Sequence, residues 1–285
     1  MKFIDYWRTN RRHCQALLFD IDGTLSRGSH VLPGVAELLG ELRAEGFPHC
    51  ILTNDGNHST EEKSEILAGG GLGVAPDEIV SCGSALKELA AARGWAGECF
   101  FVLGDMGNPS FVEQAGLRVC RDERAIEACY GVVNGEGYYD WHNHMQSVIN
   151  FFRRHPDRPF VVPNPDSYWP GVKPGVVGVG AGAQARFISG LLQEMGFSVP
   201  PIYLGKPYRP IYDYTVHRLR ERFPAAGDFR YDRIIMLGDS LQSDIRGANR
   251  CGMVSALVLT GITDAAEAAR ADGDCRPRLI FDTIG

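Results

Sequence analysis

The feature that most constrains the fold of this chain is an alternation of short apolar runs with amphipathic helical patterns. Apolar runs occur at 16–20, 49–53 and 78–82, and helical patterns follow them at 33–45, 59–67 and 84–93. Parallel strands need long crossover connections, which are usually helices. The alternation therefore predicts βαβ units and a parallel sheet with helices on both faces.

The pattern changes in the middle of the chain. Between about 98 and 182, strand-like runs are rich in glycine, proline and aromatic residues, and clear helical patterns are fewer. The alternation then resumes, with helices predicted at 183–195 and 210–222 and strands at 232–237 and 255–259. We therefore predict one α/β core domain, formed by 1–97 and 183–285, that is interrupted by an inserted domain at 98–182.

Charge and cysteine content narrow the function classes. The 285 residues carry a net charge of −6, so we expect neither a nucleic acid polymer nor an anionic membrane as a partner. The first apolar stretch, 16–19, is far too short to span a bilayer. The eight cysteines are scattered without a CxxC pair, which favours reduced thiols in a cytoplasmic protein over a disulfide framework.

The run LLFDIDGT places two aspartates at the end of the first predicted strand. Open α/β sheets bind ligands at the carboxyl ends of their strands. Asp20 could attack an electrophile such as phosphorus, and Asp22 could protonate the leaving oxygen and later deprotonate water. The alternative is an aspartate pair in a loop that caps a helix.

Two further motifs carry groups suited to an anion. Thr53 and Asn54 follow the second strand in ILTND, where the threonine hydroxyl and nearby backbone N–H groups could hold a phosphate oxygen. Lys206 lies in LGKP, where its charge could neutralise both a nucleophile and a transferred phosphoryl group. Taken singly, the first motif is also a common turn and the second a common surface lysine.

The fourth motif, IIMLGDSLQSDIRGA, places Asp239 directly after a strand and Asp244 five residues later. Magnesium prefers hard oxygen ligands and takes few protein carboxylates. We expect Asp239 to be a direct ligand of Mg²⁺, whereas Asp244 binds metal-bound water or orients Lys206. A helix N-terminus decorated with acidic residues is the alternative interpretation.

The ordered set of these motifs resembles the haloacid dehalogenase superfamily of aspartate-nucleophile phosphohydrolases. The segment Asn164-Pro165-Asp166, and the passage GVGAGAQARFISGLLQEMG that leads into LGKP, look like its type IIA, or NagD-like, subclass. The resemblance implies a Rossmann-like three-layer core with a parallel sheet and an inserted α/β cap domain at 98–182.

The same resemblance implies roles for the motif residues. Asp20 would be the nucleophile and a Mg²⁺ ligand, and Asp22 would be the general acid and base and a ligand through its backbone carbonyl. Thr53, Asn54 and Lys206 would hold the phosphate, Asp239 would bind the metal, and Asp244 would complete the acidic cluster.

Within the predicted cap, the residues expected to set substrate specificity are Asn164, Asp166, Tyr168 and Trp169. Ordinary packing of the cap is the alternative for these four. The resulting hypothesis is a cytoplasmic Mg²⁺-dependent phosphatase that hydrolyses small phosphomonoesters, such as a sugar phosphate or a nucleotide, through an aspartyl-phosphate. A non-catalytic binding protein of the same fold and another phosphotransferase of the superfamily are the alternatives. Association of identical chains through the cap stays open.

Overall fold

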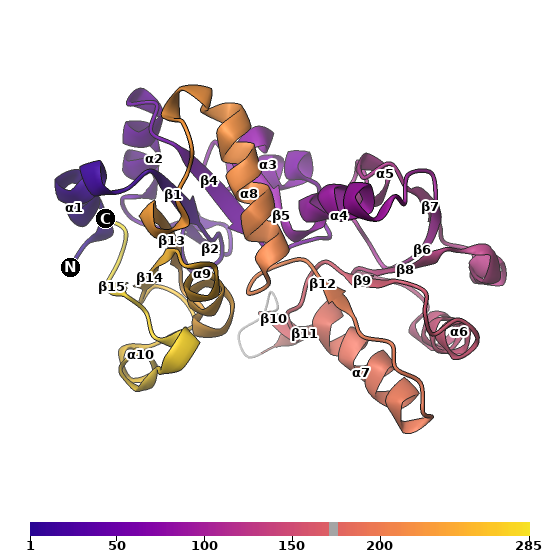
Figure 1. Cartoon of the computed structure of the whole chain (residues 1–285). Coiled ribbons are helices and arrows are strands. Elements are labelled where there is room, and N and C mark those ends of the chain that lie inside the picture. The colour runs from indigo at the N-terminus through magenta and orange to yellow at the C-terminus, as the bar shows by residue number, and fades with distance from the viewer. Residues whose placement is uncertain (171–175) are drawn as a thin grey trace. The chain divides into compact units, whose positions relative to one another are not determined.

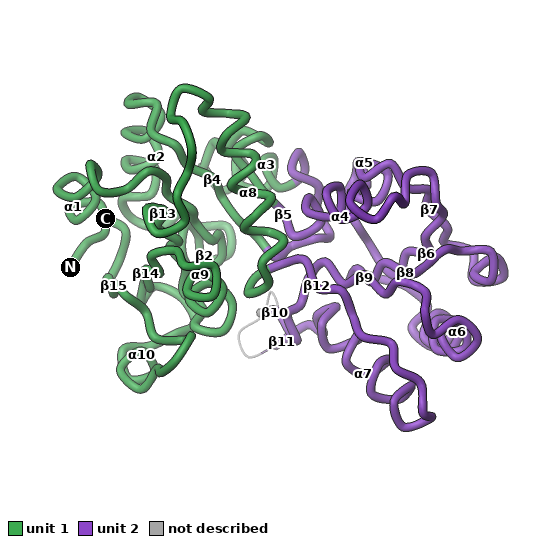
Figure 2. The backbone as a smooth tube through the Cα atoms, viewed as in Figure 1, with its two compact units in different colours: residues 1–53, 63–80, 206–285 green, residues 54–62, 81–205 purple. Residues whose placement is uncertain are grey.

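The computed structural model of the chain describes residues 1–170 and 176–285, and it consists of two compact units (Figures 1 and 2). The first unit comprises residues 1–53, 63–80 and 206–285, and the second comprises 54–62 and 81–205. Residues 171–175, which fall inside the predicted cap domain, lie outside the described residues.

The first unit is built on a six-stranded sheet. Its strand order is β15-β14-β13-β1-β4-β5. Neighbouring strands pair in parallel from β15 through to β4, with Phe19 of β1 beside Leu237 of β13 and Ile51 of β4. The strands are β1 (Ala16–Phe19), β4 (His49–Thr53), β5 (Ile79–Ser81), β13 (Ile234–Gly238), β14 (Val254–Val258) and β15 (Leu279–Phe281). A small antiparallel pair, β2 (Ser26–Arg27) with β3 (His30–Val31), follows β1.

Helices cover both faces of this sheet. Leu17 and Phe19 of β1 pack on one face in a core shared with α1 and α2, whereas α8 contacts β4 and α9 contacts β14. All residues of β1 and β4 are buried, whichever face of the sheet their side chains point to, as expected for a parallel sheet between two helical layers. The helices are α1 (Phe3–Asn10), α2 (Val35–Ala44), α3 (Thr60–Gly69, which begins in the second unit), α8 (Arg209–Arg222), α9 (Arg246–Cys251) and α10 (Ala265–Arg270).

The second unit has its own sheet and core. Its five strands pair in parallel in the order β12-β9-β8-β6-β7. Helices α6 and α7 cover one face with buried side chains such as Phe151 and Ile188. The strands are β6 (Cys99–Leu103), β7 (Arg118–Cys120), β8 (Gly131–Asn134), β9 (Phe160–Val162) and β12 (Ile202–Tyr203), and β10 (Tyr168–Pro170) pairs separately with β11 (Val177–Val179). The helices are α4 (Leu86–Arg93), α5 (Phe111–Gln114), α6 (Trp141–Arg154) and α7 (Ala181–Glu194).

The predicted α/β class with parallel sheets is confirmed, and the predicted strands and helices outside 98–182 are found within a few residues of their predicted ends. The compact units are bounded differently from the predicted domains, because 54–62, 81–97 and 183–205 group with the second unit. The prediction of an inserted cap at 98–182 stays a prediction. No helix in the described part of the chain is long and apolar enough to cross a membrane.

Candidate active site

The first unit brings four predicted site residues together at the carboxyl end of its sheet. Asp20 follows β1 and Asp239 follows β13, and these two strands are parallel neighbours. The backbone N–H of Asp20 donates to the carbonyl of Leu237 at 2.9 Å, which continues the strand pairing by one residue. The register therefore places the two aspartates side by side.

Lys206 lies at the centre of this group. Its Nζ atom donates to a carboxylate oxygen of Asp20, to Oδ1 of Asp244 at 2.7 Å and to the carbonyl of Leu52 at 3.2 Å. The side chain of Lys206 is only 2% exposed and that of Asp244 only 1%. A buried ammonium is costly unless it is paired and hydrogen-bonded, and these three acceptors meet that need.

Three carboxylates surround the lysine. One oxygen from each of Asp20, Asp239 and Asp244 lies within 4.8 Å of the others. When all three carboxylates are ionised and Lys206 is protonated, the buried site carries an excess of two negative charges. A divalent cation would neutralise that excess, and carboxylate oxygens are ligands that Mg²⁺ prefers. The residues present therefore fit a magnesium ion.

Two glycines leave the space that the Asp239 carboxylate occupies. A Cβ atom at Gly261 would lie 1.7 Å from Oδ2 of Asp239, and one at Gly23, where φ is +79°, would lie 2.2 Å from it. The same oxygen accepts a hydrogen bond from the backbone N–H of Ile262 at 2.7 Å. The loops after β1 and β14 thus approach Asp239 by their backbones, and this orients its carboxylate.

The electrostatics of the cluster follow from burial and crowding. Burial raises the pKa of Asp20 well above its usual value; Lys206 opposes this rise, whereas Asp244 and Asp239 add to it. Burial and the neighbouring Asp244 raise the pKa of Asp239 to about 7. Burial alone would lower the pKa of Lys206, but Asp20 and Asp244 outweigh that effect and raise it, so the lysine keeps its charge.

Thr53 is next in sequence to a residue that contacts the cluster, whereas the side chain of Asp22 is exposed. Thr53 is the last residue of β4, is buried, and directly follows Leu52, whose carbonyl accepts from Lys206. The side chain of Asp22 is exposed, and in the described part of the chain it has neither a hydrogen bond nor an ion pair. The structure therefore groups Asp20, Lys206, Asp239 and Asp244, but it does not bring the Asp22 carboxylate among them.

The remaining predicted residues belong to the second unit, where three of them form one network. The Asn54 side chain donates to Oδ2 of Asp166 at 3.0 Å, and the backbone N–H of Asp166 donates to Oδ1 of Asn164 at 2.9 Å. The Asn164 side chain in turn donates to Oε1 of Glu136 at 2.5 Å. Glu136 also accepts from the backbone N–H of Ala181, which starts α7. Asp166 is thereby fixed by hydrogen bonds on two sides.

Tyr168 and Trp169 lie in β10, and both side chains are exposed. The ring of Trp169 packs over Gly178 of β11. A Cβ atom at Gly178 would lie 2.1 Å from the indole, so only glycine leaves room for the ring. Nothing polar joins these two residues to the Asn164–Asp166 network among the described residues.

Sequence reasoning missed Gly261, Ile262 and Glu136. A signal for the first two exists, since Thr260-Gly261 follows a predicted strand just as Asp20 and Asp239 do. Glu136 follows β8 in the run GVVNGEG, but a glutamate after a strand is too common to single out.

Comparisons with known proteins agree with this geometry. Residues 17–118 match the family model of haloacid dehalogenase-like hydrolases, and residues 203–285 match a second model of hydrolases of that kind. The chain belongs to the haloacid dehalogenase-like hydrolases. The predicted family, including its NagD-like type IIA subclass, is thereby confirmed, and the relatives below bear the names of phosphatases or of chronophin.

Three relatives illustrate the likeness. Chronophin of Rattus norvegicus is 29% identical, over 95% of this chain and 85% of its own. The ribonucleotide monophosphatase NagD of Escherichia coli K12 is 25% identical, over 87% of this chain and 88% of its own. The crystal structure of a glycerol phosphate phosphatase from Mycobacterium tuberculosis, in complex with magnesium, is 25% identical with a TM-score of 0.80, and the match covers 100% of this chain and 78% of that one.

Proposed function

We propose that this chain is a Mg²⁺-dependent phosphatase that hydrolyses small phosphomonoesters through an aspartyl-phosphate. The observation that carries the proposal is the buried group of Asp20, Asp239 and Asp244 around Lys206 at the ends of parallel strands. The relatives support it, since their names describe phosphatases of glycerol phosphate and of ribonucleotide monophosphates.

The chain's own residues supply the reacting groups. A carboxylate oxygen of Asp20 forms a bond to phosphorus while the bond from phosphorus to the ester oxygen breaks. Asp22 donates a proton to that departing oxygen, and the alcohol leaves. Asp22 then takes a proton from water, the water oxygen attacks the phosphorus, and inorganic phosphate is released as the Asp20 carboxylate is regenerated.

Charge on the phosphoryl oxygens is stabilised by groups held in place before the reaction. Lys206 is already fixed by two carboxylates and a carbonyl, so it needs little reorganisation to face a phosphate. Thr53 and Asn54 are proposed to hold phosphate oxygens at the end of β4. Asp20, Asp239 and the backbone carbonyl of Asp22 would hold Mg²⁺, with Asp244 behind them. The metal supplies Lewis-acid neutralisation of the transferred group when bound.

The second unit is proposed to act as the cap that selects the leaving group. Asn164 and Asp166 are candidates because their hydrogen bonds to Glu136 and Asn54 fix them in one arrangement. Tyr168 and Trp169 offer exposed aromatic surface next to them in sequence. Pre-positioned polar groups beside aromatic surface suit a small polar leaving group such as a sugar, a glycerol or a nucleoside.

We further propose a cytoplasmic location, which the scattered cysteines without a CxxC pair support. Association of identical chains through the cap stays a prediction, and light scattering in solution checks it.

Replacing Asp20 by Asn tests the proposed reaction. With Mg²⁺ present, Asp20→Asn should lower the turnover of p-nitrophenyl phosphate by roughly 10³-fold or more, because the amide cannot act as the nucleophile. The matched control is Asp157→Asn, an exposed aspartate of the second unit, which should keep wild-type turnover. Acid-quenched wild-type enzyme should carry phosphate on Asp20, detected by mass spectrometry.

Near-wild-type activity of Asp20→Asn would refute the nucleophile assignment. A panel of phosphorylated metabolites compared by kcat/KM then ranks the substrates. Binding of these esters without release of phosphate would favour the non-catalytic alternative, and transfer of phosphate to an added alcohol in place of water would favour a phosphotransferase.

A further inference from the structure

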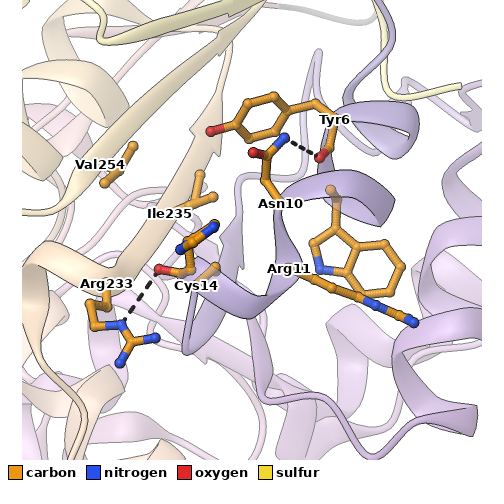
Figure 3. Close-up of a pocket in the computed structure, with 9 residues that line it drawn as sticks. Tyr6, Asn10, Arg11, Cys14, Arg233, Ile235 and Val254 are labelled. Carbon is orange, nitrogen blue, oxygen red and sulfur yellow. Dashed lines mark hydrogen bonds between the residues drawn. The ribbon is translucent and has the colours of Figure 1, made fainter.

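Polar side chains outside the acidic cluster differ in what they bind. Around a pocket of about 320 Å³ beside α1, Asn10 donates to the carbonyl of Tyr6, and Arg233 donates to the carbonyls of residues 12 and 13 (Figure 3). These hydrogen bonds to the backbone hold segments of the fold together. Glu136 of the second unit is different, because it binds a side chain that the sequence predicts to belong to the site.

Glu136 has a buried carboxylate that joins three segments of the second unit. The residue follows β8 and is 6% exposed. Its Oε1 atom accepts from the Asn164 side chain at 2.5 Å and from the backbone N–H of Ala181 at 3.0 Å. Nδ2 of Asn57 lies 3.5 Å from its Oε2 atom. A buried carboxylate is costly unless it is hydrogen-bonded, and these donors meet part of that need.

The stability of the fold does not explain an acid at this position. Burial raises the pKa of Glu136, and the hydrogen bonds from Ala181 and Asn164 only partly oppose this rise. The neighbouring carboxylates of Asp55 and Asp166 add to it. A neutral side chain of similar size is often as stable as a buried charge, or more stable. The acid therefore calls for an explanation other than stability.

The backbone at Glu136 is closely fixed. The N–H of Asp105 donates to the carbonyl of Glu136 at 2.5 Å. A Cβ atom at Gly104 would lie 2.1 Å from that carbonyl oxygen, and one at Gly135 would lie 2.1 Å from the carbonyl oxygen of Asp105. The loops after β6 and β8 thus approach each other by their backbones, and this fixes the point from which the Glu136 side chain starts.

A relay of hydrogen bonds leads from Glu136 to Asn54. Because Oε1 of Glu136 acts as an acceptor for a backbone N–H as well, the Asn164 amide presents its Nδ2 atom to it. Oδ1 of Asn164 is thereby turned to the backbone N–H of Asp166, which donates to it at 2.9 Å. The Asp166 carboxylate in turn accepts from Nδ2 of Asn54 at 3.0 Å. Each acceptor thus sets the orientation of the next amide.

We propose that Glu136 is a positioning residue that sets, through Asn164 and Asp166, the orientation of the Asn54 side chain. This inference rests on the proposed function, in which Asn54 holds a phosphate oxygen. Every phosphomonoester carries that phosphate. Loss of Glu136 should therefore weaken the turnover of all substrates alike, whereas loss of a residue that touches the leaving group affects some substrates more than others.

Glu136→Ala tests the proposal with Mg²⁺ at saturation. We expect kcat/KM to fall about tenfold or more, by the same factor for p-nitrophenyl phosphate and for the metabolite that the panel ranks first, because a misplaced binding group costs that much. Glu136→Gln keeps an acceptor oxygen for Asn164 and for the N–H of Ala181, so it should stay within about threefold of wild type. The matched control Glu113→Ala, at an exposed glutamate of α5, should leave kcat/KM unchanged. Losses that differ between the two substrates would overturn the proposal.

A double-mutant cycle separates positioning from general damage to the second unit. In the background of Asn54→Ala, Glu136→Ala should lower kcat/KM by less than about twofold, because the side chain on which it acts is gone. General damage would lower kcat/KM by the same factor in both backgrounds, and that result would also overturn the proposal.

The Asn54 side-chain amide gives a readout that needs no activity. Its ¹⁵N signal, identified by its absence in the spectrum of Asn54→Ala, should shift in Glu136→Ala and stay close to its wild-type position in Glu136→Gln and Glu113→Ala. If circular dichroism shows that Glu136→Ala does not fold, Asn164→Ala breaks the relay one step further along and should shift the same signal. An unmoved Asn54 signal in a folded variant would refute the positioning role. Absence of hydrolysis by the wild-type enzyme would instead refute the proposed function, and the amide signal would still decide whether Glu136 orients Asn54.

Discussion

Gly261 has no room for a side chain, because a Cβ atom would collide with the Asp239 carboxylate at 1.7 Å. Gly261→Ala should therefore displace Asp239 from its hydrogen bond with the N–H of Ile262. If Asp239 is a metal ligand, the Mg²⁺ concentration needed for half-maximal activity should rise about tenfold or more, since changes next to metal ligands typically cost that much. A Mg²⁺ titration of p-nitrophenyl phosphate hydrolysis measures it.

Gly40→Ala is the matched control, because a Cβ atom at Gly40 in α2 meets nothing within 4 Å. That variant should keep the wild-type Mg²⁺ dependence and raise the free energy of unfolding by about 0.5–1 kcal/mol, as expected for alanine in place of glycine within a helix. An unchanged Mg²⁺ titration in a folded Gly261→Ala variant would argue against the role proposed for Asp239.

Helix α6 depends on its first turn in a way that can be tested separately. Its N-cap is Asp140, whose side chain accepts from the backbone N–H of Asn143 at 3.2 Å, and its buried face includes Phe151 and Phe152. Asp140→Ala should lower the free energy of unfolding of the second unit by about 1 kcal/mol, because it leaves helix N–H groups without an acceptor. Denaturant unfolding followed by circular dichroism measures the loss.

Asp140→Ser is the conservative partner of that variant, since a serine hydroxyl also caps helices. It should restore most of the lost stability. Equal losses in the alanine and serine variants would show that the aspartate acts through something other than the cap.

The elements that the sequence predicts well are those with a continuous apolar run or a clear apolar helical face. Strands such as β1 and β13 are short apolar runs, and helices such as α8 show a clear apolar face, so both follow from the sequence. Helix α1 is not among the predicted elements, although its buried residues Phe3, Ile4 and Trp7 recur at helical spacing. The helix has only eight residues, and so short a pattern does not by itself predict a helix.

The residues of the candidate site also differ in how far the local sequence predicts them. Asp20 and Asp239 could be predicted because each ends a strand of a parallel sheet, where ligands bind. Lys206 and Asp244 were candidates from their own motifs, although a surface lysine and an acidic residue at a helix N-terminus were the alternatives. The family resemblance favoured the site interpretation, and the structure brings all four residues together although their roles stay predictions. The position of Gly261 after a predicted strand could have marked it as a site residue, but its close approach to Asp239 depends on how the loop after β14 folds, which the local sequence does not determine.

In the first unit, at the end of the sheet opposite the candidate active site, the buried carboxylate of Glu78 contacts the sheet and the helices on both of its faces. Glu78 lies 2.9 Å from the His49 Nε2 atom of β4 and accepts from Arg43 of α2 at 2.7 and 3.0 Å. It also accepts from the backbone N–H of Ala75 at 2.8 Å, and Arg222 of α8 lies 3.9 Å away. One side chain thus joins both helical layers to the sheet between them.

This network predicts how the stability of the protein depends on pH. Burial alone would raise the pKa of Glu78, but the hydrogen bonds from His49, Arg43 and Ala75 outweigh burial and hold that pKa well below its usual value of 4.5. Because the pKa is lowered in the folded state, the unfolded chain binds the proton more readily. The stabilisation by Glu78 is therefore complete above about pH 4.5, and it is lost as the pH falls from there through the lower folded pKa.

Glu78→Gln should thus lower the free energy of unfolding by about 2 kcal/mol near neutral pH, because it replaces hydrogen bonds to a buried charge with weaker neutral ones. The difference from wild type should shrink steadily below pH 4.5, because the unfolded wild-type chain then takes up a proton on Glu78 that the folded chain binds only at lower pH. Urea unfolding over a pH series measures both. Glu65→Gln, at an exposed glutamate of α3, should match wild type throughout, which separates the network from the general loss of one negative charge. A Glu78→Gln deficit that stays constant down to the acid limit would mean that the side chain contributes through its shape and not through its charge.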